Sequence, residues 1–256
     1  MGKDLAGKVA IVTGGSDGIG KATATLLAKR GATVAICARR AEVLEAARAE
    51  IAEHGTVEAH ILDVSDEAAF TALVEDVAKR HGRLDMMVNN AMSVHYAPLT
   101  DLTMEHWRKD FAVNADAVFT GTKAAMKIMM KQGGGSIVNI ASTTAIRSAP
   151  YMASYSASKA ALVQFSSCAA IEGAPANVRV NVIVPGQVMT PATEFWATKA
   201  PETAARTAAA IPMQRGGQPD ELAEPIVFLL SDAASYITGV AIPVDGGKSV
   251  QLYMPS

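Results

Sequence analysis

The chain has 256 residues, half of them hydrophobic, and its formal net charge is −2, with 23 basic and 25 acidic residues. This length suits one large α/β domain or two small ones. The balanced charge gives no electrostatic reason to expect a nucleic acid or an anionic membrane as a partner. Five histidines and two cysteines are too few and too scattered to predict a metal site.

The two cysteines, Cys37 and Cys168, lie in a strand-like and a helical segment, and we expect buried thiols rather than a disulfide. The N-terminus lacks the charged-then-apolar pattern of a signal peptide. No apolar run approaches the length that spans a membrane. The sequence therefore predicts a cytoplasmic protein without a membrane partner.

The first segment joins a short β-branched run, a glycine-rich turn and a helical pattern. Residues 8–13 predict a strand, Gly14-Gly15-Ser16-Asp17-Gly18-Ile19-Gly20 follows it, and a helix is predicted to continue to Arg30. Glycines let the backbone approach a phosphate, and a helix amino end offers free N–H groups and a positive dipole. The position of the turn between strand and helix favours a dinucleotide site.

The same turn also matches seven of the eight positions of a phosphate loop for nucleoside triphosphates, from Gly15 to Lys21. The eighth position must carry Ser or Thr to hold magnesium, and this chain has Ala22, with Thr23 one residue later. The departure argues against a nucleoside triphosphate.

Strands and helices then alternate along the chain. Strands are predicted at 33–37, 57–62, 84–88, 136–140, 178–184 and 240–244, and helices at 41–53, 66–81, 103–131, 152–172 and 220–231. This alternation with apolar strands predicts a parallel sheet with helices on both faces. We therefore predict one doubly wound α/β domain over residues 1–256, with a seven-stranded parallel sheet.

The stretch from Gln187 to Gln218 interrupts this alternation and is far longer than a normal connection. It follows the carboxyl end of a strand and contains Phe195, Trp196 and an Ala-rich segment. We interpret residues 187–218 as a substrate lid or wall. A helical excursion packed on the core is a compatible alternative.

Tyr155 and Lys159 carry the clearest chemistry. They are four positions apart in a predicted helix, so their side chains project from one face. A lysine ammonium beside a phenol favours the phenolate and lowers its pKa, so the pair could exchange a proton with a substrate oxygen. Ser142 lies near the carboxyl end of the strand upstream, where open α/β sheets bind ligands.

Together these motifs resemble the classical short-chain dehydrogenase/reductase family, over roughly residues 5–247. The resemblance rests on Thr13-Gly14 with Gly18-Ile19-Gly20, Asp63-Val64, Asn89-Asn90-Ala91, Asn114, Ser142, Tyr155 with Lys159, and Pro185-Gly186 with Thr190. Each motif is weak alone, but their order and spacing argue against coincidence. The resemblance implies a Rossmann-type fold and an NAD(P)-dependent oxidoreductase. Its reaction would transfer a hydride between the nicotinamide and a small, mostly apolar ketone or secondary alcohol.

The resemblance also implies roles for single residues. Tyr155 would protonate the carbonyl oxygen or deprotonate the alcohol, and Lys159 would lower the Tyr155 pKa and hold the nicotinamide ribose. Ser142 would polarise the substrate oxygen, and Asn114 would hold a water that links Lys159 to solvent. The cofactor would contact Tyr155 and Lys159 together with Gly14, Ser16, Asp17, Gly18, Ile19, Gly20, Asp63, Val64, Asn90, Ala91, Pro185, Gly186, Val188 and Thr190.

The end of the second predicted strand favours NADP(H) over NAD(H). In dinucleotide folds an acidic residue there bonds the ribose 2′-hydroxyl, whereas a nearby arginine accommodates a 2′-phosphate. This chain has neutral Ala38 followed by Arg39 and Arg40, and Arg39 is the first choice for the phosphate contact. Against this, Asp17 stands where some NADP-preferring relatives carry a basic residue. The arginines could also simply begin a solvated helix.

One position departs from the family, which usually has Gly after Asn-Asn-Ala where this chain has Met92. We expect its side chain to alter the backbone or to narrow the pocket. The candidate substrate walls are mostly apolar: Met92, Val94, Tyr96, Ile146, Tyr151, Phe195 and Trp196. Two alternatives remain, a reductase of carrier-bound 3-oxoacyl chains and a non-catalytic dinucleotide-binding protein. The resemblance further implies a homotetramer or homodimer.

Overall fold

The protein is described by a computed structural model over residues 3–252, so residues 1–2 and 253–256 of the predicted domain lie outside the described part. Seven parallel strands form one sheet in the order β3-β2-β1-β4-β5-β6-β7. The strand order reverses between β1 and β4, which creates the switch point at which doubly wound sheets bind ligands. The strands are β1 (Val9–Thr13), β2 (Thr33–Ala38), β3 (Val57–Ile61), β4 (Met86–Asn89), β5 (Gly135–Ile140), β6 (Val178–Pro185) and β7 (Ala241–Val244).

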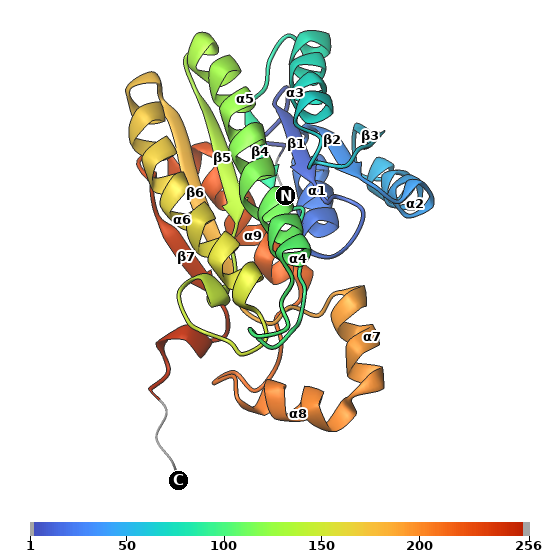
Figure 1. The fold of residues 1–256 in the computed structure, drawn as a ribbon. Coiled ribbons are helices and arrows are strands. Elements are labelled where there is room, and N and C mark those ends of the chain that lie inside the picture. Colours follow the sequence, from blue (N-terminus) through green and yellow to red (C-terminus); the bar gives the residue numbers. More distant parts are fainter. Residues whose placement is uncertain (1–2, 253–256) are drawn as a thin grey trace.

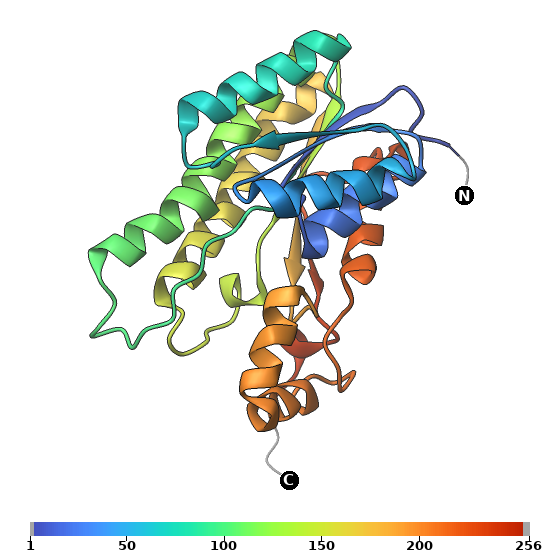
Figure 2. The ribbon, with the colours of Figure 1, turned by 90° about the vertical axis from the view of Figure 1, so that its right-hand side faces the viewer.

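Helices cover both faces of this sheet, as predicted (Figures 1 and 2). One layer contains α1 (Gly18–Lys29), α2 (Ala41–Ala52) and α9 (Pro219–Leu230), and the other contains α3 (Glu67–His81), α5 (Ala117–Gln132) and α6 (Ala153–Gly173). Successive strand residues point to opposite faces. In β1, for example, Val12 packs with the first layer and Ile11 with the second. Apolar residues on both faces of the strands therefore build the two main cores.

The predicted helix 103–131 has an interruption at its functional position. It consists of α4 (Met104–Phe111), a π turn (Ala112–Asp116) and α5, and Asn114 lies inside the π turn. A π turn inserts one residue into the helical repeat and often marks a functional site. Side-chain bonds from Asn114 to another segment fix this turn, so helix propensity could not reveal it.

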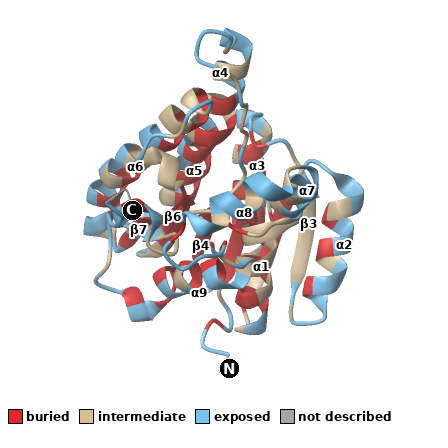
Figure 3. Cartoon of the chain, turned by 90° about the horizontal axis from the view of Figure 1, so that it is seen from below, coloured by how far each residue is buried: buried red, intermediate tan, exposed pale blue. Residues whose placement is uncertain are grey.

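Residues 187–218 contain two short helices, α7 (Pro191–Lys199) and α8 (Pro201–Ala209), each begun by a proline. Gly217 N donates to Gln187 O over 2.9 Å, and Met189 N donates to Gly217 O over 2.8 Å, so the two ends of the excursion are fastened together. Neither helix has a buried residue (Figure 3). The excursion therefore projects from the core beyond the carboxyl ends of the strands (Figure 1).

Two further expectations also differ from the structure. β4 begins at Met86 rather than at Leu84, because the N–H and C=O of Leu84 bond to the side chain of Gln132. Cys37 is buried, but Cys168 is exposed, so the prediction of two buried thiols was wrong for Cys168. Cys168 lies at helical spacing from exposed Ile171, on the outer side of α6.

No helix within residues 3–252 has both the length and the apolar character needed to cross a membrane.

Candidate active site

The four predicted catalytic residues come from three segments near the carboxyl ends of β4 and β5. Tyr155 and Lys159 lie on the first turns of α6, Ser142 follows β5, and Asn114 lies in the π turn. Both α6 side chains face inward and are buried. The fold thus brings together residues that are up to 45 positions apart in the sequence.

Lys159 is almost completely buried, with 1% of its surface exposed. Its Nζ donates to Ile140 O over 2.7 Å and lies 5.9 Å from the centre of the Tyr155 ring. Burial lowers the pKa of Lys159 from 10.5 to about 7, because the ammonium loses its hydration. Lys159 therefore carries only part of a positive charge near neutral pH.

Tyr155 does not behave as the sequence predicted. Burial raises the pKa of Tyr155 to about 12, although its hydrogen bond with Ser142 lowers it, and the nearby Tyr96 and Asp110 raise it further. We expected Lys159 to lower this pKa, but the lysine is itself desolvated and holds its proton weakly. In the protein alone, Tyr155 is therefore a protonated phenol at neutral pH.

Ser142 is arranged as a hydrogen-bond donor. Its Oγ accepts hydrogen bonds from Thr144 N over 3.2 Å and from Thr144 Oγ1 over 3.1 Å. Since these bonds use the oxygen lone pairs, the Ser142 O–H is directed elsewhere. A hydroxyl held in this way beside a phenol can donate to a substrate oxygen.

Asn114 connects the loop after β4 to α6. Its Oδ1 accepts from Ser93 N over 3.0 Å, and its Nδ2 donates to Ser93 O over 2.8 Å and to Ser158 Oγ over 3.0 Å. Ser158 Oγ in turn donates to Tyr155 O over 2.8 Å. Both amide protons of Asn114 are thus used, and a water could bind its side chain only at the second lone pair of Oδ1.

The glycine-rich turn is closely packed and leaves the start of α1 open. A Cβ on Gly20 would lie 2.2 Å from Gly14 O, and Gly14 has a φ of +64°, so both positions require glycine. The side chain of Asp17 at the N-cap makes no capping bond, and the first turn of α1 has no acidic residue. The amino end of α1 therefore keeps its capacity for an anion.

The turn also faces the loop after β6. A Cβ on Gly18 would lie 2.9 Å from Thr190 Cγ2, which shows how closely the two segments approach. At the base of this loop, a Cβ on Gly186 would lie 2.8 Å from Asp245 Cα. Predicted contacts for the two ends of a dinucleotide therefore line one continuous edge.

Thr13 fixes the residues that follow β4. Its Oγ1 accepts from Asn90 N over 2.9 Å and from Ala91 N over 3.0 Å, and Asn90 Nδ2 donates to Thr13 O and Gly14 O. Met92 does not have a positive φ, and its side chain is 52% exposed. The backbone at Met92 therefore does not have the left-handed conformation that would favour glycine.

Arg39 and Arg40 each face a carboxylate. Arg39 Nη1 lies 3.8 Å from Asp63 Oδ2, and Arg40 pairs with Asp17 of the glycine-rich turn. Asp63 also accepts from Ser65, and Val64 beside it is buried. The end of β2 therefore carries both arginines next to the predicted phosphate turn.

The predicted substrate walls lie on three different segments. Met92, Tyr96, Ile146, Tyr151, Phe195 and Trp196 are exposed, and Val94 is half-buried. The structure joins two of the segments, since Ala97 N donates to Tyr151 O over 3.0 Å. Tyr151 has a φ of +65°, a conformation that is costly for a bulky residue.

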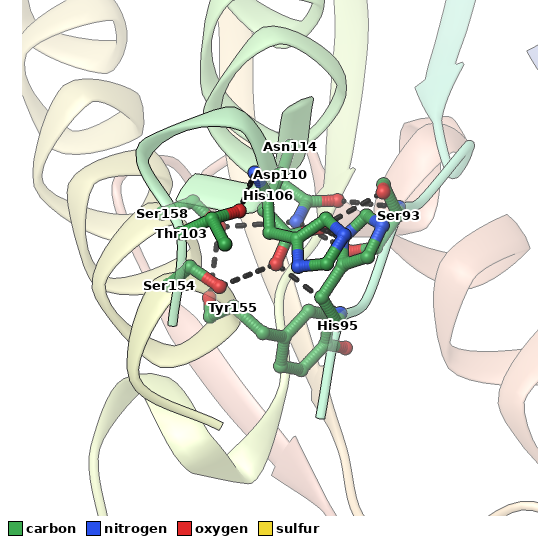
Figure 4. A network of polar contacts seen from close by, with 9 residues as sticks. All are labelled: Ser93, His95, Thr103, His106, Asp110, Asn114, Ser154, Tyr155 and Ser158. Carbon is green, nitrogen blue, oxygen red and sulfur yellow. Dashed lines mark hydrogen bonds and ion pairs between the residues drawn. The ribbon is translucent and has the colours of Figure 1, made fainter. Parts of the chain in front are cut away.

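The sequence analysis missed a set of polar residues around Asn114: Ser93, His95, Asp110, Ser154 and Ser158 (Figure 4). Asp110 precedes Asn114 by four positions, so helical spacing already places both on one face. Ser154 is adjacent to Tyr155 in the sequence. These two signals were available, whereas the positions of Ser93 and His95 depend on the path of a loop.

A cavity of about 1000 Å³ lies at the opposite, amino end of the strands. Several of its charged side chains are already paired. Lys8 and Arg83 face Asp85, and Arg179 donates to backbone carbonyl oxygens at the end of α9. The predicted catalytic residues lie instead at the carboxyl end of the strands.

The fold and these side chains define a nicotinamide-dependent oxidoreductase with a Rossmann-type sheet. A family model described as Enoyl-(Acyl carrier protein) reductase matches residues 14–249. The chain belongs to the short-chain dehydrogenase/reductase family.

Two curated relatives illustrate the chemistry found in this family. The 3-oxoacyl-(acyl-carrier-protein) reductase FabG of Thermotoga maritima is 42% identical over 245 residues, which cover 95% of this chain and 98% of the relative. The cyclopentanol dehydrogenase of Comamonas testosteroni is 39% identical over 242 residues, which cover 94% of this chain and 96% of the relative.

Two solved structures are similar over nearly their whole length. An NAD⁺-bound xylitol dehydrogenase has a TM-score of 0.89 at 33% identity, with 95% of this chain and 99% of the other covered. A protein described as an NAD(P)-dependent gluconate 5-dehydrogenase from Beutenbergia cavernae, with bound NADP, has a TM-score of 0.92 at 36% identity, with 98% and 100% covered. Similar structures therefore bind either nicotinamide cofactor.

The buried lysine generates a stability prediction. Because the pKa of Lys159 is lowered by burial, the unfolded chain binds a proton between about pH 7 and pH 10.5 that the folded chain does not bind. Lysine burial therefore destabilises the fold most at or below neutral pH. Lys159→Met should therefore raise the melting temperature near pH 7, by about 2–4 °C for each kcal/mol added to the free energy of unfolding. This increase should become smaller as the pH approaches 10.5, the ordinary pKa of lysine.

Differential scanning calorimetry at several pH values measures this gain. Lys127→Met, on the exposed side of α5, is the control and should change little. A Lys159→Met variant that melts lower than the parent at neutral pH would contradict the prediction.

Proposed function

We propose that this protein is an NADP(H)-dependent reductase and dehydrogenase of small, mostly apolar ketones and secondary alcohols. The observation that carries the proposal is the meeting of Tyr155, Ser142 and Lys159 at the same carboxyl edge of the sheet as the uncapped amino end of α1. The first two offer a proton and a hydrogen bond to one substrate oxygen. A non-catalytic dinucleotide-binding protein would have no need of this set.

The residues present fit a dinucleotide. The amino end of α1 is uncapped, the turn before it has no room for side chains at Gly14 and Gly20, and two arginines stand at the end of β2. The bound nicotinamide supplies or accepts the hydride. In this proposal Lys159 holds the nicotinamide ribose, and the loop after β6 adjoins the nicotinamide.

Tyr155 exchanges the proton in the proposed reaction. As a buried phenol with a pKa of about 12, Tyr155 is protonated at neutral pH, which suits donation of its proton to a carbonyl oxygen. Ser142 donates a second hydrogen bond to the same oxygen and stabilises the negative charge that develops there. Asn114 fixes the start of α6 and so the position of Tyr155.

The proposed substrate is small and apolar because the exposed side chains near the site are apolar or aromatic. A cyclopentanol dehydrogenase among the relatives is consistent with such a substrate. The relative from Thermotoga maritima favours a second candidate, a reductase of carrier-bound 3-oxoacyl chains. An acidic carrier needs a basic surface, for which Lys127 and Lys131 on α5 are candidates, but residues 173–177 before β6 have no positive charge.

Replacement of Tyr155 tests the reaction directly. Tyr155→Phe removes only the phenolic O–H, so cofactor binding should persist while turnover falls by about 10²–10⁴-fold. The absorbance of reduced nicotinamide, followed with a panel of ketones, measures turnover. Tyr236→Phe is the control at an exposed tyrosine. Near-normal turnover of Tyr155→Phe on a good substrate would refute the catalytic assignment.

Phe195 and Trp196 of α7 are proposed to govern substrate size. Both are exposed on a helix with no buried residue, so they are available to cover an apolar substrate. Phe195→Ala with Trp196→Ala should raise KM for bulky apolar ketones by about tenfold, which corresponds to about 1.4 kcal/mol, and should change cofactor affinity less. Steady-state kinetics across a size series measures the effect, with Tyr236→Ala as control. Unchanged selectivity would remove the lid from the proposal.

The preference for NADP(H) is supported by charge at the end of β2. Ala38 is neutral, so no carboxylate repels a 2′-phosphate at that position. Arg40 pairs with Asp17 and offsets the one acidic group of the glycine-rich turn. Arg39 is exposed and its ion pair with Asp63 is long, so its guanidinium can turn to a phosphate at low cost.

Catalytic efficiency with both cofactors tests this preference. The parent should prefer NADP(H), and the double variant Ala38→Asp with Arg39→Leu should shift the ratio of kcat/KM values toward NAD(H) by at least about tenfold. Arg48→Leu, whose partner Glu45 lies on the same helix, is the control. A parent that prefers NAD(H) would overturn this part of the proposal.

A further inference from the structure

Asp110, on the last turn of α4, is a buried carboxylate that no catalytic role uses. Among the carboxylates in residues 3–252 it alone has no exposed surface, while Asp85 keeps 7%. Burial would raise the pKa of Asp110, but hydrogen bonds from Ser154, His95 and Ser93 outweigh this effect and hold the pKa below its usual range. Asp110 is therefore a buried anion at neutral pH.

The two oxygens of Asp110 bond to two other segments of the chain (Figure 4). From the loop after β4, Ser93 Oγ donates to Oδ1 over 2.8 Å, and His95 Nδ1 lies 2.7 Å from the same oxygen. From the first turn of α6, Ser154 Oγ donates to Oδ2 over 2.6 Å. One carboxylate thus ties α4, this loop and α6 together.

The hydrogen bonds of Asp110 to Ser154 and to Ser93 both affect segments that hold proposed catalytic residues. Ser154 directly precedes Tyr155, so its bond to Asp110 restrains the backbone that bears the phenol. Ser93 is also the residue whose backbone N–H and C=O bond to Asn114. Asp110 and Asn114, one helical turn apart, therefore hold the same loop against the same end of α6.

His95 is the solvent-facing end of this network. Because a carboxylate only accepts, the His95 proton lies on Nδ1. Its ring stacks on His106 with 4.3 Å between ring centres and keeps part of its surface exposed. The ionisable groups that face Asp110 are thus His95 from the loop and Tyr155 from α6, with His106 behind His95.

We propose that Asp110 is a positioning residue for the reaction, which holds the start of α6 and the loop after β4 in the geometry that Tyr155 needs, with His95 as a hydrogen-bond partner. The proposal rests on the catalytic role proposed for Tyr155. The negative charge of Asp110 also acts on the phenol of Tyr155, since it raises the pKa of that phenol. If Asp110 had only a structural role, its replacement would affect folding but would not change the pKa of Tyr155.

The test uses Asp110→Asn, which keeps the shape and removes the charge, and Ser154→Ala, which removes only the tie to α6. Asp110→Asn should lower kcat for ketone reduction by about tenfold or more and leave cofactor KM within about twofold. Ser154→Ala should lower kcat in the same direction. The double variant should be no worse than Asp110→Asn alone, since both changes break one path. Asp116→Asn, an exposed carboxylate in the π turn, is the control and should retain parent kcat.

The pH profile gives a second readout with a defined sign. Ketone reduction needs protonated Tyr155, so the rate falls as the pH rises through the pKa of that group. Removal of a nearby negative charge makes the phenolate less unfavourable and lowers this pKa. In Asp110→Asn the fall in rate should therefore begin at lower pH than in the parent.

Parent-like kcat in Ser154→Ala and a folded Asp110→Asn, or a pH profile that does not move, would overturn the proposal. If Asp110→Asn does not fold, Ser154→Ala alone decides, because a small hydroxyl is lost and the carboxylate remains. Tyr155→Phe is measured in parallel. Its activity reports on the proposed function, whereas parent-like Asp110 and Ser154 variants beside an inactive Tyr155→Phe would refute only the positioning role.

Discussion

The site depends on one constraint, which is that α6 turns polar side chains toward the interior. Ser154, Tyr155, Ser158 and Lys159 are all buried on this helix, and buried polar groups cost free energy unless they are hydrogen-bonded. Their partners come from other segments. Ser154 Oγ donates a hydrogen bond to the carboxylate of Asp110, and Lys159 Nζ donates to Ile140 O. Ser158 Oγ accepts a hydrogen bond from the Asn114 side chain. The loop after β4 in turn bonds to Asp110 and Asn114 through Ser93.

The burial of these polar side chains in the site lowers the stability of the fold. Burial lowers the pKa of Lys159 and raises the pKa of Tyr155, so neither side chain is easily charged in the protein alone. Hydrophobic residues at these positions would avoid that cost of desolvation. In the proposed reaction, the phenol of Tyr155 nevertheless holds the proton that a ketone oxygen would receive.

The parts that surround the site differ in how firmly they are held. The glycine-rich turn and the segment after β4 are joined by Thr13, whose hydroxyl accepts two backbone N–H groups. In contrast, α7 and α8 have no buried residues and are fastened at their base near Gln187 and Gly217. Binding surfaces are often carried on such exposed segments over a firmly held scaffold.

The sequence by itself determined the strand–helix alternation, the glycine-rich turn and the residues Ser142, Tyr155 and Lys159. These features depend on local patterns, such as apolar strands, positions that exclude a Cβ and two side chains four positions apart on a helix. Only the tertiary structure decided the π turn at Asn114, the direction of the Tyr155 pKa and the hydrogen-bond partners of Asp110. Each of these depends on burial and on partners distant in the sequence, and neither can be read from local spacing. The same reason explains Cys168, whose exposure follows from the face of α6 that packs on the sheet.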